Sequence, residues 1–207
     1  MADAAEPSRS PASARRPRRT EAAPSNVRLF VALDLPEPVV DGLVAWRAPL
    51  VHERDGLRAV PPASLHVTLA FLGWKQEESI APLAELVQGC AREAGGVRSL
   101  ALGAALWLPR RRPRVLALAL EDRHGQLGGL QERLVERLVA GGWHEREGRP
   151  YLPHVTVARV RGGGTVRTGE LPAPPGLAFD GAAVVLYRSH LSGAGAEYEA
   201  LAVGRLA

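Results

Sequence analysis

The chain has 207 residues, of which 46% are hydrophobic, and this suits one globular domain rather than a fibre or a membrane protein. No apolar run approaches the roughly 20 residues of a membrane helix, and the N-terminus lacks the apolar stretch of a secretory signal. The single cysteine, Cys90, excludes an intrachain disulfide and a cysteine-based zinc site, and favours a reducing, cytoplasmic setting. The net charge of +4 favours anionic partners.

The first 25 residues differ in composition from the rest of the chain. They are rich in Ala, Pro, Ser and Arg and show no hydrophobic periodicity, so we predict a disordered tail over 1–25. The arginines at 15–19 leave two interpretations open, a solvated extension or a contact with RNA. The folded domain is predicted over 26–207.

The first half of the predicted domain alternates strands with helices. The run VRLFVALDL, residues 27–35, is predicted to be a strand from its length and β-branched content. Apolar residues at helical spacing predict an amphipathic helix over 38–51, and SLHVTLAFLG, 64–73, is predicted to be a strand that ends at Gly73. A second helix is predicted over 77–94.

The second half contains a hairpin, a helix and further strands. Two apolar runs, 97–108 and 114–120, flank a basic turn and predict a β-hairpin. Leucines at helical spacing, followed by two glycines, predict a helix over 126–140. The remaining strands are predicted over 153–160, 182–187 and 198–203. Because hairpins and helices are interleaved, the predicted fold class is α+β.

One pentapeptide occurs twice, as HVTLA at 66–70 and HVTVA at 154–158, each within a predicted strand. Side chains two residues apart in a strand point to the same face. His66 and Thr68 therefore project together, and so do His154 and Thr156, while the residues between them point into apolar packing. Two such strands facing each other would present two imidazoles and two hydroxyls to one cleft.

This set of side chains suits the opening of a cyclic phosphodiester. The reaction needs one group that activates water and a second that protonates the leaving oxygen, and two imidazoles provide both near neutral pH. Threonine hydroxyls donate hydrogen bonds to the phosphate oxygens as charge builds up on them. We therefore predict His66 and His154 as catalytic residues and Thr68 and Thr156 as phosphate-binding residues. No carboxylate accompanies either motif, so no metal site and no cofactor are predicted.

Arginines near the motifs are candidates for phosphate binding. Arg159 follows the second motif, and regular alternation would place it on the face opposite His154, so it reaches the site only from the strand end or past a bulge. The arginines of the turn, Arg110 to Arg112, have two interpretations that the sequence leaves open: a solvated hairpin tip or a contact with the RNA backbone.

The doubled His-x-Thr motif resembles that of the two-histidine phosphoesterase superfamily. The rest of the domain resembles its LigT-like branch, the RNA 2′,3′-cyclic phosphodiesterases also called ThpR and first described as 2′-5′ RNA ligases. The similar segments follow the order of that family: RLFVALDLP at 28–36, LHVTLAFLG at 65–73, RPRVLALAL at 112–120, PHVTVAR at 153–159 and LYRSHLSGAGAEYEAL at 186–201.

The resemblance implies a bilobal α+β fold, with two antiparallel-sheet lobes related by a pseudo-two-fold axis around a central cleft and helices outside. It implies hydrolysis of a terminal 2′,3′-cyclic phosphate to a 2′-phosphomonoester without a metal. By position, Arg159 would contact the nucleotide and the aromatic Phe30 would help to hold the base. The family picture makes His154 the residue that activates water and His66 the one that protonates the 3′ oxygen.

Two other functions stay open at this stage. The same site run in reverse would join RNA ends through a 2′-5′ linkage. An RNA-end binding module is the alternative from another class, in which the arginines would matter more than the histidines. The expected partners are RNA ends or cyclic nucleotides, without a membrane, and the expected state is a monomer.

Overall fold

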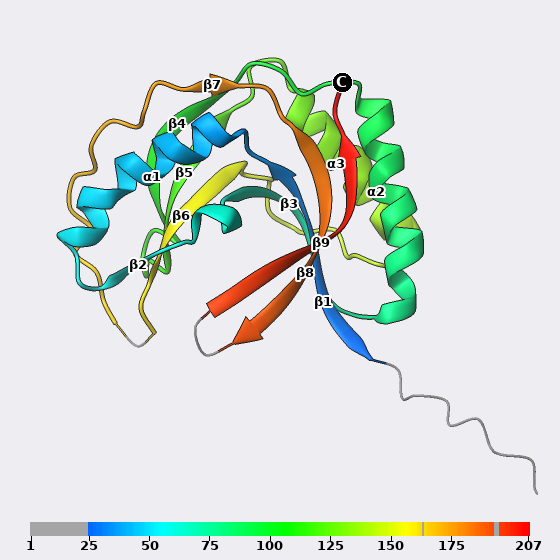
Figure 1. The fold of residues 1–207 in the computed structure, drawn as a ribbon, viewed down its shortest axis with the longest axis horizontal. Helices are drawn as coiled ribbons and strands as arrows, with labels where there is room; N and C mark the ends of the chain where they lie inside the picture. The colour runs from blue at the N-terminus through cyan, green and yellow to red at the C-terminus, as the bar shows by residue number, and fades with distance from the viewer. Residues whose placement is uncertain (1–24, 163, 193–194) are drawn as a thin grey trace, which may run out of the picture.

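The computed structural model describes residues 25–162, 164–192 and 195–207. The prediction of a disordered tail over 1–25 falls almost entirely on residues outside these ranges and stays a prediction. Within the described ranges the chain folds into one continuous sheet with helices on its outer side (Figure 1).

The first half of the domain contains both of its predicted strands and both of its predicted helices. Short elements that were not predicted, β2 and the 3-10 turns η1 and η2, lie between them. In chain order the elements are β1 (Asn26–Asp34), α1 (Glu37–His52), β2 (Leu57–Ala59), η1 (Pro62–Ser64), β3 (His66–Gln76), η2 (Glu77–Ser79) and α2 (Ile80–Ala94).

The second half follows the predicted order, with one further short strand, β7. The helix α3 has the bounds that the leucine spacing predicts, and the last two strands are longer than predicted and form a hairpin. The elements are β4 (Leu100–Leu108), β5 (Val115–Glu121), α3 (Gln126–Ala140), β6 (His154–Val160), β7 (Ala178–Phe179), β8 (Ala183–Ser192) and β9 (Gly195–Arg205).

The strands form two groups that meet at a narrow seam. The order across the antiparallel sheet is β7-β4-β5-β6-β3-β1-β8-β9, and β2 pairs with β6 beside the seam. Only Val67 of β3 and Val155 of β6 pair directly across the seam. The predicted α+β fold with two antiparallel lobes is thereby confirmed, since each lobe contributes one copy of the repeated motif to the seam.

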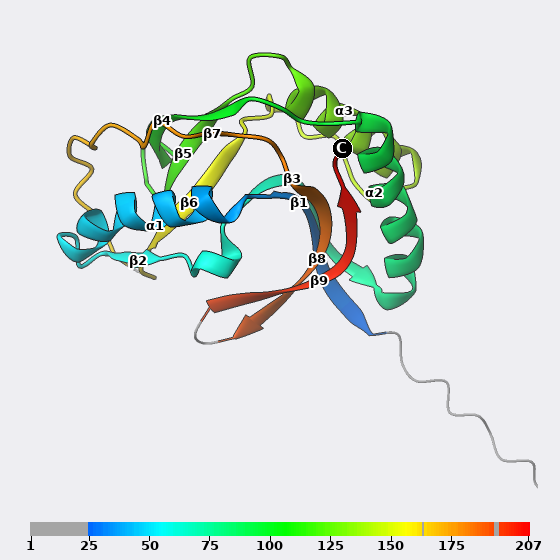
Figure 2. The same cartoon turned by 45° about the horizontal axis from the view of Figure 1, so that its top comes forward.

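The helices cross over between the lobes. Helix α1 follows β1, which belongs to one lobe, but packs on β6 and β2 of the other; α3 follows β5 and packs on β3 of the opposite lobe. Figures 1 and 2 show α1 at one end of the arched sheet and α2 with α3 at the other. The exchange ties the two lobes together more firmly than the single pair at the seam.

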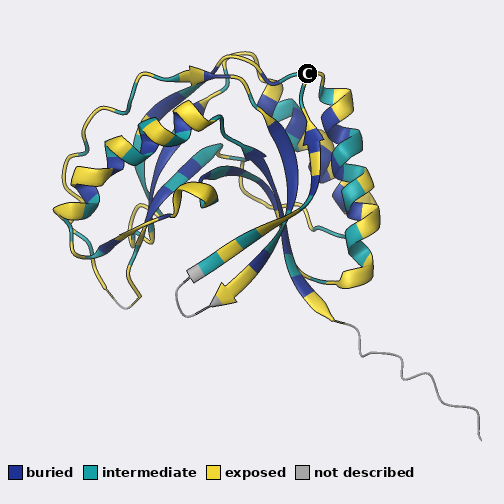
Figure 3. Ribbon diagram, viewed as in Figure 1, coloured by how far each residue is buried: buried dark blue, intermediate teal, exposed yellow. Residues whose placement is uncertain are grey.

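The buried residues gather on the strands and on the inner faces of the helices (Figure 3). Leu29, Leu33, Val67 and Val155 are fully buried, in agreement with the alternation that the sequence predicts for the apolar positions of β1 and of the two motifs. Residues that point to the other face of β3 and β6 are therefore the ones that line the concave side of the sheet.

The prediction that β3 ends at Gly73 is wrong, because the strand continues to Gln76. The pairing of β1 with β3 skips Leu72, so a bulge precedes Gly73. Gly73 has a φ of 72°, which glycine adopts without the steric cost that a side chain brings. The glycine therefore turns the strand at a bulge and does not end it.

A bulge lies at the same place of the repeat in both motif strands. The pairing of β1 with β3 skips Leu69, and the pairing of β5 with β6 skips Val157. Gln131 of α3 donates to the carbonyl of Leu69 at 3.3 Å, and Arg47 of α1 donates to the carbonyl of Val157 at 2.8 Å and also to that of Val60. Each bulge is thus held by a polar side chain from the helix that crosses over.

Arg47 is 4% exposed, so its bonds to backbone carbonyls are removed from water. We expect Arg47→Met to lower the free energy of unfolding by about 1–3 kcal/mol, because two buried carbonyls lose a charged donor. Urea denaturation measures this loss as a lower midpoint. Arg92→Met, at an exposed position of α2, is the control and should change stability by less than about 0.5 kcal/mol. Equal midpoints for the two variants would contradict the role of Arg47.

Candidate active site

The seam between the lobes brings the two copies of the motif together. Because Val67 and Val155 pair and both point into the core, their neighbours His66, Thr68, His154 and Thr156 all point to the opposite face. In an antiparallel pair, His66 then lies opposite Thr156, and Thr68 lies opposite His154. The four predicted side chains form one group on the concave side.

The register also sets the spacing of the two imidazoles. His66 and His154 are diagonal neighbours across the seam, and such neighbours have Cα atoms about 7–8 Å apart. Two imidazoles at this separation leave room for a phosphate between them. The hydroxyls of Thr68 and Thr156 occupy the other diagonal, so imidazoles and hydroxyls alternate around the same space.

Both histidine rings are held in the same way. Nδ1 of His66 bonds the carbonyl of Ser64 at 2.9 Å, and Nδ1 of His154 bonds the carbonyl of Leu152 at 2.8 Å. A carbonyl only accepts, so Nδ1 carries the proton in each ring. Nε2 is therefore the atom of each neutral imidazole that is able to accept a proton.

Thr68 is itself fixed by its surroundings. Its Oγ1 lies 3.2 Å from Nε2 of His66, and its backbone carbonyl accepts a hydrogen bond from the Tyr151 hydroxyl at 3.1 Å. Burial raises the pKa of Tyr151, so the phenol keeps its proton and remains a donor. The hydroxyl of Thr68 thereby lies next to Nε2 of the first histidine.

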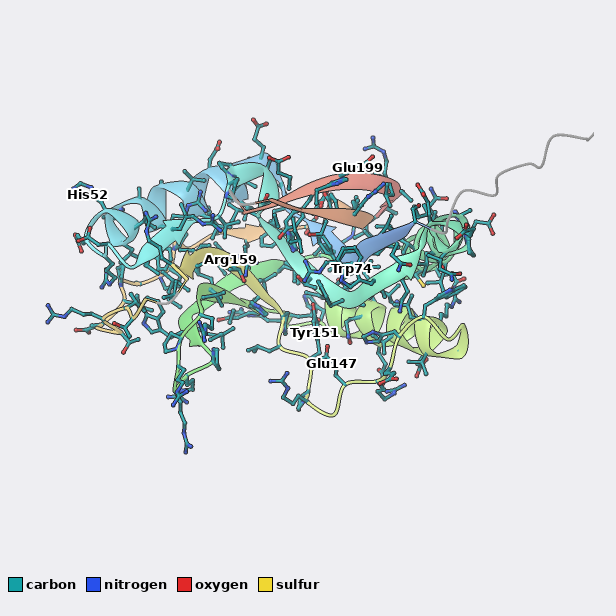
Figure 4. All side chains as sticks on the ribbon, turned by 90° about the horizontal axis from the view of Figure 1, so that it is seen from below. His52, Trp74, Glu147, Tyr151, Arg159 and Glu199 are labelled. Atoms are coloured by element: carbon teal, nitrogen blue, oxygen red, sulfur yellow. The ribbon has the colours of Figure 1, made fainter. Side chains whose placement is uncertain are left out.

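The bulge at Val157 decides where Arg159 lies. Without the extra residue, alternation would turn Arg159 into the core, on the side of Val155. The side chain is exposed instead, and its charge acts on His66. Arg58 of β2 pairs directly opposite Arg159, which adds to the positive charge at this end of the site. Figure 4 looks onto this side of the sheet, with Arg159 toward one end and Trp74 toward the other.

The site keeps His66 neutral in the free protein. Burial lowers the pKa of His66 from 6.5 to about 4, because the imidazolium loses water around it. The hydrogen bond to the carbonyl of Ser64 raises the pKa and offsets part of this drop, while electrostatic repulsion from Arg159 and His154 lowers the pKa further. An anion bound between these groups would raise the pKa of His66, since a negative charge favours the protonated form of the imidazole.

Phe30 lies in an aromatic cluster against the first histidine. Its ring centroid is 5.0 Å from that of His66, 5.2 Å from that of Tyr187 and 4.8 Å from that of Tyr198. Phe30 is only 3% exposed, so its ring packs against the imidazole and is covered in this conformation by the two tyrosines. The predicted contact of Phe30 with a base is thus not open in the structure, and Tyr198, half-buried at the surface of the cluster, is the ring nearer to solvent.

Asp34 supports the cluster from the end of β1, the strand that also carries Phe30. It pairs opposite His66, and one of its carboxylate oxygens accepts a hydrogen bond from the Tyr187 hydroxyl at 2.7 Å. Burial raises the pKa of Asp34, and the bond from Tyr187 partly offsets that rise. Sequence reasoning missed this pair and Tyr198, because residues on β8 and β9 are far from His66 along the chain and carry no repeated pattern.

A cavity of about 1080 Å³ opens beside two of the four side chains. Thr68 and His154 line it, together with Phe71 and Tyr151, and it continues to Arg114 at the base of the β4–β5 hairpin. Its volume is at the upper end of the range for small-molecule sites, so it has room for far more than a phosphate. Among the described residues no three His, Cys, Asp or Glu side chains gather as metal ligands would.

Comparison with known proteins identifies the family of the chain. The family model described as LigT like Phosphoesterase matches residues 33–117. An RNA 2′,3′-cyclic phosphodiesterase of Thermus thermophilus is 32% identical across 84% of this chain and 88% of its own. The chain belongs to the LigT-like phosphoesterase family. An RNA 2′,3′-cyclic phosphodiesterase of Escherichia coli is 34% identical across 64% of this chain and 71% of its own.

Solved structures share the fold as well. The crystal structure of a Thermus thermophilus protein has a TM-score of 0.74 at 30% identity and covers 86% of this chain and 97% of its own. Escherichia coli LigT complexed with 3′-AMP has a TM-score of 0.71 at 26% identity and covers 88% of this chain and 99% of its own. Across the described residues, no helix is long and apolar enough to cross a membrane.

The electrostatics of the site make a testable prediction about His66. Its imidazole should take up a proton near pH 4 in the free protein, and Arg159→Gln should raise that pKa because a repelling charge is removed. NMR of the ring signals against pH measures both values. Arg161→Gln is the control, since Arg161 bonds the carbonyl of Asp55 and does not act on His66. A free-protein pKa of His66 near 6.5 would contradict the burial argument.

Proposed function

We propose that this protein hydrolyses the terminal 2′,3′-cyclic phosphate of RNA to a 2′-phosphomonoester, with His66 and His154 as acid and base and without a metal. The pairing of Val67 with Val155 carries the proposal, because it gathers two imidazoles and two hydroxyls on one face. The relatives named RNA 2′,3′-cyclic phosphodiesterase support the same reaction. The two imidazoles provide both the acid and the base of the reaction, so no other residue is needed for proton transfer.

The reaction requires two proton transfers on opposite sides of phosphorus. A water oxygen forms a bond to phosphorus and loses a proton to one imidazole, while the bond from phosphorus to the 3′ oxygen breaks and that oxygen gains a proton from the other. The register places His66 and His154 at diagonal positions across the seam, so a phosphate bound between them would have one imidazole on the side of each of these oxygens.

The division of roles follows the resemblance. His154 activates the water, which the adjoining cavity admits, and His66 protonates the leaving 3′ oxygen. His66 is neutral in the free protein, so it has to gain its proton in the presence of substrate. The cyclic phosphate is an anion, and a negative charge beside an imidazole favours the protonated form. Binding of the substrate therefore prepares the acid.

The phosphate is held by hydroxyls and by arginine. Thr68 and Thr156 donate to the non-bridging oxygens, and these bonds strengthen as charge moves onto them in the transition state. Arg159 reaches the site past the bulge and offers a guanidinium, which suits phosphate geometry. Arg58, opposite Arg159, brings a second positive charge to the same end.

The partner in this proposal is an RNA end or a cyclic nucleotide. Escherichia coli LigT has been crystallised with 3′-AMP, with NADP+ and with ATP, which supports a nucleotide ligand for this chain. We further propose that the protein works as a monomer in the cytoplasm, a setting with which its single buried cysteine agrees.

Joining of RNA ends remains a secondary activity of the same site, because the groups that cleave a phosphodiester also form it in reverse. In water, the equilibrium between hydrolysis and joining favours hydrolysis. An RNA-end binding module without turnover is the competing class, and it makes the histidines dispensable. The alternatives therefore differ in what happens when either histidine is removed.

The first test is hydrolysis of adenosine 2′,3′-cyclic phosphate in excess EDTA, with the 2′ and 3′ monophosphates separated by chromatography. We expect only the 2′ isomer, and a loss of at least about a hundredfold in kcat for His66→Ala and His154→Ala, the scale of general acid-base catalysis. His52→Ala, at an exposed position at the end of α1, is the matched control and should retain full activity. Turnover that survives in both site variants, or that EDTA abolishes, would refute the proposal.

The coupling between substrate charge and His66 gives a second test. Saturation with the product 2′-AMP should raise the pKa of His66 above its free-protein value of about 4, because the bound phosphate stabilises the imidazolium. The same NMR titration with adenosine, which lacks the phosphate, should leave the pKa near its free value. An identical pKa with 2′-AMP and with adenosine would mean that the phosphate does not bind beside His66.

A further inference from the structure

The concave face of β3 carries two exposed aromatic residues beyond the site. Phe71 is 42% exposed and Trp74 is 62% exposed. The bulges at Leu69 and Leu72 keep both on the face of His66 and Thr68, since Phe71 pairs opposite Phe30 and Trp74 pairs opposite Arg28. Counted along the paired residues of β1, at about 3.3 Å per residue, Phe71 lies roughly 13 Å and Trp74 roughly 20 Å from His66.

A cation lies between these two aromatic residues. The guanidinium of Arg28 is 4.4 Å from the centre of the Phe71 ring, and it also donates to the hydroxyl of Ser189 at 3.3 Å. The bond to Ser189 holds the guanidinium near the ring. An arginine stacked on an aromatic ring offers a flat, positively charged surface, on which nucleic-acid bases stack.

The three residues Phe71, Arg28 and Trp74 lie next to the site. Phe71 lines the same cavity as Thr68 and His154, and Trp74 stands just beyond it on the same face. Single exposed apolar residues are ordinary on protein surfaces. Two aromatic side chains around a stacked arginine, on one sheet face and leading out of a cavity that holds a phosphate-binding group, form a surface suited to a single-stranded nucleic acid.

We propose that the RNA chain on the 5′ side of the cyclic phosphate runs along β3, with successive bases stacked on the Phe71–Arg28 pair and on Trp74. The proposal rests on the proposed function, since the cyclic phosphate at the histidines fixes the end of the chain. It makes an oligonucleotide, rather than a cyclic mononucleotide, the preferred substrate. The wall of the cavity carries Asp122, Glu132 and Glu147 as well as arginines, so stacking, more than phosphate charge, holds the chain.

The test compares adenosine 2′,3′-cyclic phosphate with a trinucleotide of adenylates that ends in the cyclic phosphate. The parent protein should have a kcat/KM at least about tenfold higher for the trinucleotide, because base stacking on an aromatic ring contributes about that factor or more per base. Trp74→Ala should reduce this preference about tenfold by raising the KM for the trinucleotide. Its kcat/KM for the mononucleotide should stay within about twofold of the parent value. Phe71→Leu should also reduce the preference.

Two further variants make the result specific. Trp74→Phe keeps a ring and should restore most of the preference. Val139→Ala, at an exposed position of α3 away from the concave face, should leave kcat/KM unchanged for both substrates. Equal kcat/KM values for the two substrates in the parent, or an equal loss on both in Trp74→Ala, would overturn the proposal while the hydrolase function stands.

Failure of the hydrolase function would look different. If the parent turns over neither substrate, the affinity for a trinucleotide that ends in a 2′-phosphate, measured by fluorescence anisotropy, tests the surface directly. Weaker binding by Trp74→Ala, and recovery in Trp74→Phe, would support the surface in a binding protein. Affinities that match across the parent and both variants would overturn it, and affinities that fall steeply with salt would mean that phosphate contacts dominate instead.

Discussion

The site depends on one extra residue in each of two strands. The pairing of β3 with β1 skips Leu69, and the pairing of β6 with β5 skips Val157. Beyond each skipped residue, the alternation of side chains between the two faces of the sheet is shifted by one residue. The carbonyls of the two skipped residues accept hydrogen bonds from Gln131 and Arg47, so neither carbonyl is left unsatisfied. Past each bulge, the side chain that regular alternation would bury turns to the concave face.

The same two bonds connect the lobes. Only one residue pair joins β3 to β6 directly, and that seam would be a weak hinge by itself. Helix α1, which begins after β1, packs on β6 and holds its bulge, while α3 does the same for β3. Separation of the lobes would therefore break the packing of both helices, and this coupling fixes the diagonal distance between the two imidazoles.

The sequence predicts the parts of this arrangement that repeat and fails where the backbone is irregular. The doubled motif is enough to place each histidine on one face of its strand with the threonine of the same motif, because alternation over three residues is reliable. Arg159 could not be placed, since no residue type marks a bulge at Val157, and the end predicted at Gly73 is wrong because a glycine bends a strand as readily as it breaks one. The cluster of Phe30 with Tyr187 and Tyr198 arises from contacts between distant strands, which local patterns do not record.

The two copies of the repeat differ at the positions that would distinguish the two directions of an RNA chain. Phe71 and Arg159 occupy the same position, three residues after the motif threonine and past the bulge, in the two copies of the repeat. One copy thus continues into an aromatic ring stacked on Arg28, and the other into a guanidinium opposite Arg58. A phosphate between the histidines is nearly symmetric, but an RNA end is not, because it has bases on one side only. Unlike residues at equivalent positions would let the protein tell which way the chain leaves the phosphate, while equal ones would bind it in either orientation.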